Sequence, residues 1–157
     1  METAFLETPL GWAQIEGDEL GLKSVNVLDE APTSTDLIPE ILEDAVYQLR
    51  EYFAGERQHF DLKLNPKGTP FQEKVWTLLS SLPYGKTISY LELSRKIGDP
   101  NAIRAVAAAN GKNPLWVVIP CHRVVGSDGS LTGYAGGLHR KKWLLDHEQG
   151  SYQQVLF

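Results

Sequence analysis

The segment LWVVIPCHRVVGSDG, residues 115–129, joins an apolar run to the sequence Pro-Cys-His-Arg. Its Cys121 is the only cysteine in the chain. Proline fixes φ and has no N–H to donate, so Pro120 predicts that a buried strand over 115–119 ends just before the cysteine. Because neighbouring side chains of an extended chain alternate faces, we expect a turn or short helical bend at Cys121 and His122.

The thiol of Cys121 has a structural and a functional interpretation. A lone buried cysteine is most often an inert, small apolar side chain. His122 and Arg123 argue against that role, because cationic neighbours favour the thiolate form. A reactive thiol beside a histidine suits a hydrolase nucleophile, a metal ligand or a direct acceptor of an alkyl group. The residues alone leave these chemistries open.

The length and composition of the chain limit the classes of protein to which it can belong. Its 157 residues, 42% hydrophobic and 22% charged, are typical of a soluble globular protein. The run LWVVI is far shorter than the ~20 residues that cross a bilayer, and the N-terminus lacks the pattern of a signal peptide. A single thiol forms no internal disulfide and suits the reducing cytoplasm. A metal site needs at least two further ligands, and no tight ligand spacing links His59, His139 or His147 to Cys121.

Charge is distributed unevenly along the chain. Residues 1–65 carry four basic and fourteen acidic residues, a net charge of −10, whereas residues 66–157 carry eleven basic and six acidic ones, a net charge of +5. A chance imbalance between two solvated faces is one explanation, and two modules with different partners is the other. The segment NPKGTP marks the change of sign. We expect an N-terminal domain over 1–64, a linker over 65–70 and a C-terminal domain over 71–157.

The first half of the chain predicts a small sheet with one helix. Alternating apolar residues between positions 3 and 28 predict two or three short strands in a meander, and residues 60–64 predict a further strand. Apolar residues at helical spacing predict an amphipathic helix of about four turns. Thr35 or Asp36 would cap its start and Gly55 would end it.

The second half predicts mainly helices. We expect them over residues 71–82, 87–98, 101–111 and 138–148. Thr87 or Ser89 would cap the second, while Asp99 would cap the third, with Pro100 as its first residue. The two middle helices match a helix-turn-helix, although an ordinary αα-corner has the same pattern. The expected fold class is α+β, a small N-terminal sheet-plus-helix domain followed by a mostly helical C-terminal domain with a helix-turn-helix.

The segment IPCHRVVGSDGSLTGYAGGLHRKKWLLDHE, residues 119–148, closely resembles the active-site segment of the O6-alkylguanine-DNA alkyltransferases, or methylated-DNA–protein-cysteine methyltransferases. Its Pro-Cys-His-Arg, Tyr-x-Gly-Gly and Trp-Leu-Leu-x-His-Glu elements stand at that family's spacing. Upstream, SYLELSRKIGDPNAIRAVAAANGKNP, residues 89–114, resembles the family's helix-turn-helix and the Asn-Pro that follows it. The N-terminal half resembles the family only in size and style.

This resemblance implies an enzyme that directly reverses DNA alkylation damage. Cys121 would accept the alkyl group of O6-alkylguanine, with O4-alkylthymine as a further candidate lesion. His122 would draw off the thiol proton through a water, Glu148 would hold the tautomer of that histidine, and Asn113 would brace the turn. A thioether has no leaving group comparable to a purine, so each molecule would act once.

The resemblance also implies how the damaged base is held. Tyr134 would donate a hydrogen bond toward the guanine, and glycine in the 133–136 stretch would let the backbone approach the base. Trp116 stands five residues before the cysteine, where some relatives carry smaller residues. If its ring faces the pocket, bulky adducts such as O6-benzyl should react poorly. The implied substrate contacts are Tyr134, Val124, Ala135, Gly136 and Trp116.

The implied partner is double-stranded DNA carrying O6-alkylguanine. The second helix of the helix-turn-helix would lie in the minor groove, with Arg104 entering the stack that a flipped nucleotide leaves and Tyr90 pressing on a phosphate. The implied DNA contacts are Tyr90, Asn101, Arg104, Ala105 and Arg123. A monomer would bind, with cooperative assembly left open.

The resemblance implies no cofactor, no metal and no membrane partner. The expected location is the cytoplasm, with nucleoid association in a prokaryote. Two alternatives stand beside the alkyltransferase. One is a non-catalytic lesion-binding protein of the same fold, which the presence of Cys121 opposes. The other is a thiol hydrolase, which the absence of an acyl-transfer motif opposes.

Overall fold

The computed structural model describes residues 1–34, 37–131, 134 and 136–155. The chain divides into two compact units. The first is Met1–Lys67 with Pro114–Val118, and the second is Gly68–Asn113 with Ile119–Phe157. Among the described residues, no helix has the length and apolar character needed to cross a bilayer.

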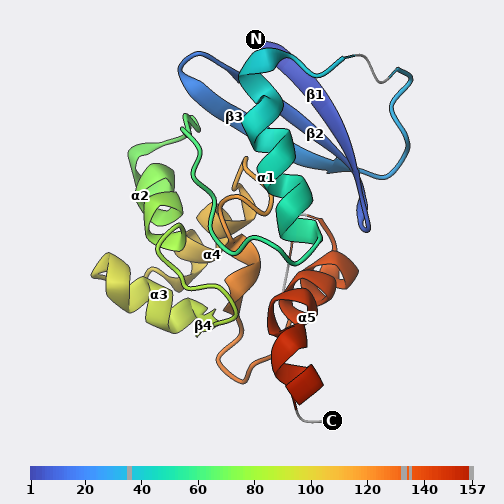
Figure 1. The fold of residues 1–157 in the computed structure, drawn as a ribbon. Coiled ribbons are helices and arrows are strands. Elements are labelled where there is room, and N and C mark those ends of the chain that lie inside the picture. Colours follow the sequence, from blue (N-terminus) through green and yellow to red (C-terminus); the bar gives the residue numbers. More distant parts are fainter. Residues whose placement is uncertain (35–36, 132–133, 135, 156–157) are drawn as a thin grey trace. The chain divides into compact units, whose positions relative to one another are not determined.

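A three-stranded antiparallel sheet forms the first unit, in the order β1-β2-β3 (Figure 1). Its strands are β1 Glu2–Thr8, β2 Gly11–Asp18 and β3 Gly21–Leu28. Alternation along β2 buries Ala13 and Ile15, as expected for a sheet with one covered face. The predicted meander is confirmed. The predicted strand over 60–64 is wrong, because of those residues only Leu64 forms a bridge, to Leu22.

Helix α1, Glu43–Phe53, follows the 3₁₀ turn η1, Glu40–Leu42, and lies across the sheet (Figure 1). Its buried face includes Leu49 and Tyr52, both fully buried. Burial of each such side chain stabilises the fold by about 1.5–3 kcal/mol. The expected N-caps, Thr35 and Asp36, lie outside the described residues.

Segment Pro114–Val118 belongs to the first unit, although the sequence assigned it to the C-terminal domain. The Val25 amide donates to the Pro114 carbonyl at 2.8 Å, and the Trp116 amide donates to the Val25 carbonyl at 3.0 Å. The Trp116 ring packs against Phe53, with centroids 5.8 Å apart. These bonds hold the segment against β3.

The predicted strand over 115–119 is wrong. Leu115 alone in this segment pairs with a strand, through a bridge to Val25. The Val118 amide then donates to the Trp116 carbonyl at 2.8 Å, and Val117 adopts a φ of 71°. This is a γ-turn with a β-branched residue in the left-handed region, which costs about 1–3 kcal/mol. The apolar run is therefore buried in a turn.

Helices and one short strand pair build the second unit. Its elements are α2 Pro70–Leu79, β4 Ile88–Ser89, α3 Tyr90–Ile97, α4 Ile103–Gly111, η2 Cys121–Arg123, β5 Val124–Val125 and α5 Leu138–Val155. Val75, Leu93, Val106 and Leu144 are each fully buried and form the core. The expected fold class, α+β with a helical C-terminal part, is confirmed.

Helices α3 and α4 form the helix-turn-helix. A capping box starts α3, since the Ser89 hydroxyl accepts from the Glu92 amide and the Glu92 carboxylate accepts from the Ser89 amide. Gly98 ends the helix with a φ of 101°, a conformation that favours glycine.

The turn into α4 differs from the prediction. Asp99 does not cap the helix and Pro100 is not its first residue, because Ala102 is the N-cap. The Asp99 carboxylate accepts from the Asn101 amide at 2.9 Å, and its carbonyl accepts from the Ala102 amide at 3.0 Å. Both hydrogen bonds of Asp99 therefore lie within the turn, and α4 starts at Ile103.

Candidate active site

The two-residue strands β4 and β5 pair in parallel, with Ile88 opposite Val124. Because β5 follows η2 directly, this pairing ties the start of α3 to the turn that carries Cys121. Neither strand has the length that a sequence pattern requires, so the pairing was not predicted.

Cys121 is the first residue of η2 and is 5% exposed. Before it, Pro120 has φ −81° and ψ 65°, and the Cys121 amide donates to the Ile119 carbonyl at 2.8 Å. These are the features of an inverse γ-turn. The predicted bend at Cys121 and His122 is confirmed, because both lie in the 3₁₀ turn.

Two asparagine side chains hold this turn, one in the last turn of α4 and one just after the helix. Asn113 Nδ2 donates to the Ile119 carbonyl at 2.7 Å, and the buried Asn110 donates to the Cys121 carbonyl at 3.4 Å. The first contact joins the turn before the cysteine, and the second joins the cysteine itself. Asn110 was not identified from the sequence, where it reads as the end of an alanine-rich helix.

The Glu148 carboxylate, on α5, is the shared hydrogen-bond partner of several polar groups around η2. His122 Nε2 lies 2.7 Å from Glu148 Oε2. Arg123 donates to the same carboxylate through Nε at 2.9 Å and Nη2 at 3.0 Å, and the Gly85 amide donates at 3.2 Å. The carboxylate is almost fully buried, with a side-chain exposure of 1%. It therefore bonds to both residues that follow the cysteine.

The charge states of this cluster follow from its contacts. Burial acts to raise the pKa of Glu148, but hydrogen bonds from His122 and Arg123 and the charge of Arg123 hold it well below its ordinary value. Burial lowers the pKa of His122 despite the nearby carboxylate, so the imidazole is neutral. Because an ionised carboxylate only accepts, Nε2 carries the imidazole proton. The buried Nδ1 has no hydrogen-bond partner among the described residues, so it remains an acceptor.

The thiol itself differs from the expectation of a resting thiolate. Burial raises the pKa of Cys121, while hydrogen bonding from Asn113, the charge of Lys141 and hydrogen bonding from Tyr134 act in the opposite direction. The expected cationic neighbours do not supply the charge, because His122 is neutral and Arg123 is paired with Glu148. The resting form is a thiol, which needs a base to become a nucleophile.

Arg123, an expected DNA contact, makes its contacts in this structure inside the protein. Its residue exposure is 6%, and Nη1 donates to the Leu82 carbonyl at 2.7 Å. Its guanidinium also lies 5.6 Å from the centre of the Tyr84 ring. Together with the two hydrogen bonds to Glu148, these contacts engage the guanidinium inside the protein.

The expected DNA contacts on the helix-turn-helix are accessible. Asn101, Arg104 and Ala105 are exposed, and Ile103 beside them is 38% exposed. Tyr90 is half-buried at the start of α3, with the Lys141 ammonium 5.8 Å from its ring centre. The exposed face of α4 thus combines small side chains with one arginine.

The expected substrate contacts are distributed over several segments. Val124 is fully buried, and its amide donates to the Cys121 carbonyl. Gly136 packs so closely against Tyr134 that an added Cβ would lie 3.1 Å from the ring. Ala135 lies outside the described residues. Trp116 belongs to the first unit and is 6% exposed, so its effect on adduct size stays a prediction.

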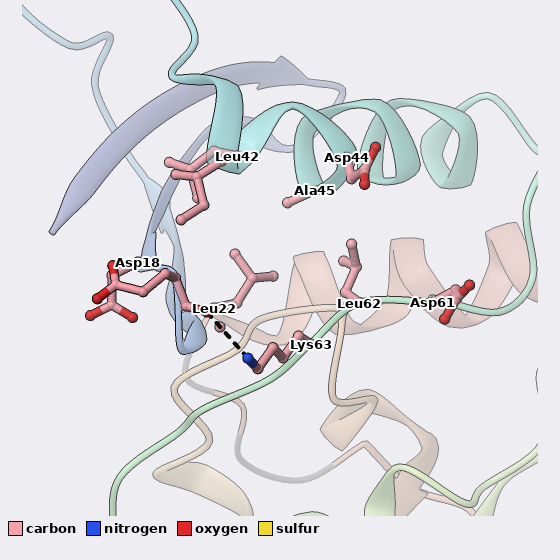
Figure 2. Close-up of a pocket in the computed structure, with 11 residues that line it drawn as sticks. Asp18, Leu22, Leu42, Asp44, Ala45, Asp61, Leu62 and Lys63 are labelled. Carbon is pink, nitrogen blue, oxygen red and sulfur yellow. Dashed lines mark hydrogen bonds between the residues drawn. The ribbon is translucent and has the colours of Figure 1, made fainter.

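A cavity of about 180 Å³ lies in the first unit and contains none of the expected site residues. Its walls combine apolar side chains such as Leu22 and Leu42 with acidic ones such as Asp44 and Asp61 (Figure 2). Lys63 bonds to the Glu19 carbonyl at 3.2 Å along one edge. Within the described ranges, no three His, Cys, Asp or Glu side chains converge to hold a metal ion.

Two family models match the chain. One is described as 6-O-methylguanine DNA methyltransferase, DNA binding domain, and matches residues 70–150. The other is described as 6-O-methylguanine DNA methyltransferase, ribonuclease-like domain, and matches residues 1–66. The first match contains η2 and residues 138–150 of α5, which carry the cysteine and the glutamate.

Curated proteins and solved structures resemble the chain over most of its length. A methylated-DNA–protein-cysteine methyltransferase of Methanosarcina acetivorans is 47% identical over 153 residues, covering 94% of this chain and 98% of that protein. The constitutive one of Bacillus subtilis is 50% identical over 114 residues, covering 72% and 69%. The crystal structure of Mycobacterium tuberculosis OGT in complex with DNA superposes with a TM-score of 0.87 at 42% identity, covering 96% of this chain and 94% of that one.

Proposed function

Because the chain belongs to the 6-O-methylguanine DNA methyltransferase family, we propose that it repairs O6-alkylguanine in duplex DNA by moving the alkyl group onto Cys121. The family activity transfers an alkyl group from damaged DNA to a protein cysteine, and this chain has one cysteine. The observation that carries the proposal is the buried turn in which the thiol precedes a histidine bonded to Glu148 at 2.7 Å.

The first step creates the nucleophile. The thiol proton passes, through a water, to Nδ1 of His122, whose other nitrogen already donates to Glu148. The ionised carboxylate stabilises the imidazolium that forms, as in other nucleophile–base–carboxylate arrangements. Arg123 and the Gly85 amide keep the carboxylate oriented.

The second step is a displacement at carbon. The sulfur of Cys121 attacks the alkyl carbon, a carbon–sulfur bond forms and the bond from that carbon to O6 breaks. The electron pair passes into the purine, which takes up a proton and leaves as neutral guanine. Tyr134 is our candidate donor to the departing base, because its phenolic O–H can donate a hydrogen bond and the resemblance assigns it that role. Overall, thiol and alkylguanine give thioether and guanine.

Each molecule reacts once in this proposal. A thioether on Cys121 has no leaving group to restore the thiol, and the chain has no second cysteine to accept the alkyl group. One chain supplies all the proposed reacting groups, so we infer that a monomer is sufficient. The protein is consumed in proportion to the lesions it repairs.

The DNA must present its lesion outside the base stack. A target atom inside a duplex is out of reach of a buried thiol, so the nucleotide flips out. The exposed start of α4 with Arg104 and Ala105, together with Asn101 in the turn before it, supports docking in a groove, and the small side chains of α4 permit close approach. Recognition of shape and phosphates, without base reading, suits an enzyme that must act at any sequence.

Intact-protein mass spectrometry after incubation with an O6-methylguanine oligonucleotide tests the proposal. We expect a mass gain of one methyl group, located on Cys121 by peptide mapping, together with unmodified guanine in the DNA. Cys121→Ala should bind the oligonucleotide without any gain. Binding without methylation of the natural chain would instead indicate a lesion-binding protein, and hydrolysis of thiol esters would indicate a hydrolase.

A further inference from the structure

The first turn of α5 contains a buried arginine, Arg140, which is 9% exposed. Arginine is almost never buried without partners, because its charge loses the hydration that it has in water. The place is unfavourable for a second reason, since the N-terminus of a helix carries a partial positive charge that repels a cation. Contacts of Arg140 inside the protein must compensate both costs.

One such contact is with the segment that precedes the helix. Arg140 Nη1 donates to the buried Gly136 carbonyl at 3.0 Å. A hydrogen bond from an ionised donor is stronger than one between neutral groups. The aliphatic part of the same side chain also lies beside Gly136, because a Cβ added there would be 3.4 Å from Arg140 Cδ. The arginine thus contacts this glycine with both its polar and its apolar part.

Tyr134 lies over the same side of Gly136. The same added Cβ would be 3.1 Å from Cε2 of the Tyr134 ring. The ring and the arginine therefore border the space where any other residue would place its side chain, which explains the glycine. The Gly137 amide also donates to the Tyr134 carbonyl at 2.9 Å. Tyr134 is thus joined to the start of α5 through its backbone and through the contact of its ring with Gly136.

Helix α5 connects this segment to the proposed proton relay. Arg140 and Glu148 are eight residues apart, which is about 12 Å along the helix axis at 1.5 Å per residue. Glu148 bonds to His122 at 2.7 Å, and the helix packs on η2, which carries the cysteine. The same helix therefore holds the histidine through Glu148 and the tyrosine segment through Arg140.

We propose that Arg140 is a positioning residue for the damaged base, which fixes the Gly136 carbonyl so that the Tyr134 hydroxyl meets the flipped guanine in one orientation. The proposal rests on the transfer chemistry proposed above. Arg140 takes no part in making or breaking bonds and acts through Tyr134. Loss of its hydrogen bond should therefore slow the departure of guanine without changing the reactivity of the thiol.

Single-turnover methyl transfer from an O6-methylguanine oligonucleotide tests the proposal. Arg140→Met keeps the aliphatic part of the side chain but loses the donor. We expect the maximal rate to fall about tenfold or more, because small displacements of a group at the reacting centre cost this much. Affinity for the oligonucleotide, measured by fluorescence anisotropy, should change little, since the exposed face of α4 is untouched. Arg140→Lys restores a charged donor and should recover much of the rate.

A double-mutant cycle with Tyr134→Phe separates positioning from a general structural role. Residues that act through one another give non-additive effects, whereas the effects of independent residues add. If Arg140 acts through the hydroxyl of Tyr134, Arg140→Met should slow the Tyr134→Phe protein by less than about twofold. The same loss of rate in both backgrounds would overturn the proposal.

Alkylation of Cys121 by iodoacetamide measures the thiol without the base. Because the chain has one cysteine, the mass gain reports this residue directly. The rate should be equal in the natural chain, in Arg140→Met and in the matched control Lys142→Met, whose side chain is 67% exposed and paired with Asp146. The control removes the same charge from the surface and should also transfer methyl at the natural rate. Faster alkylation in Arg140→Met would show a loosened cysteine turn and contradict the proposal.

Arg140→Lys replaces Arg140→Met in the cycle if the methionine variant does not fold. Its smaller loss of rate should disappear in the Tyr134→Phe background, and a loss that persists there would refute the role of Arg140. The natural chain, measured in the same assay, separates the two proposals. Absence of transfer by the natural chain would overturn the proposed function and this role with it. Equal transfer rates in the natural chain and in folded Arg140→Met would overturn only the role of Arg140.

Discussion

Arg123 and Glu148 form a two-pronged ion pair inside the second unit, with Nε to Oε1 at 2.9 Å and Nη2 to Oε2 at 3.0 Å. Side-chain exposures of 7% and 1% mean that water does not replace either partner. The pair explains how a glutamate in the middle of α5 stays ionised while it orients His122. It also explains why the arginine after the active-site histidine faces inward.

Breaking this pair should destabilise the protein. Arg123→Gln leaves a buried carboxylate without its main counter-charge, and we expect a loss of about 3–5 kcal/mol in the free energy of unfolding. Arg123→Lys keeps the positive charge but not the two parallel hydrogen bonds, so it should lose less stability. Urea unfolding measures both. Lys142→Met, which breaks an exposed pair, should change stability by at most about 1 kcal/mol, and an equal loss there would contradict the assignment.

Removal of the carboxylate charge should slow the reaction more than it weakens DNA binding. Glu148→Gln preserves shape but no longer stabilises an imidazolium at His122, so we expect single-turnover transfer to fall by about 10²–10⁴-fold. Rapid quenching followed by mass spectrometry gives the rate, and fluorescence anisotropy gives the affinity. A variant that transfers at the natural rate would show that the charge of Glu148 does not assist the proton transfer.

Stability should fall on the acid side of neutrality. The folded-state pKa of His122 lies below its ordinary 6.5, so the unfolded chain binds the proton first and stability is lost as the pH falls through that value. The pKa of Glu148 lies below its ordinary 4.5, so its contribution is present above that value and is lost as the pH falls further. Urea unfolding from pH 8 to pH 4 measures the effect. His122→Asn should flatten the curve between about pH 7 and pH 5, and an unchanged slope would refute the burial of a neutral histidine.

The α4 face should contribute to DNA binding through charge. Arg104→Ala removes the exposed arginine of this face, and we expect weaker binding together with a decrease of about one in the slope of affinity against salt. Fluorescence anisotropy at several salt concentrations measures the slope. The same slope in Arg104→Ala and the natural chain would remove this residue from the interface.

Much of the fold followed from local patterns. Period-two alternation predicted the meander, and the Ser-x-x-Glu capping box marks the start of α3. The prediction of a strand over residues 115–119 is wrong, because only Leu115 in this segment pairs with a strand. Their burial arises from contacts with β3, and buried apolar residues in a turn have the same sequence as buried residues in a strand.

By itself, the sequence determined the family and the single cysteine, and it predicted His122 and Glu148 as the residues of a proton relay, because the motifs around the cysteine are chemically specific. Only the tertiary structure decided the charge at the site. Burial makes Cys121 a resting thiol and His122 a neutral base, and Arg123 turns inward to Glu148. The pKa of a group depends on its distance from water and from other charges, and residues that are far apart in the chain set both.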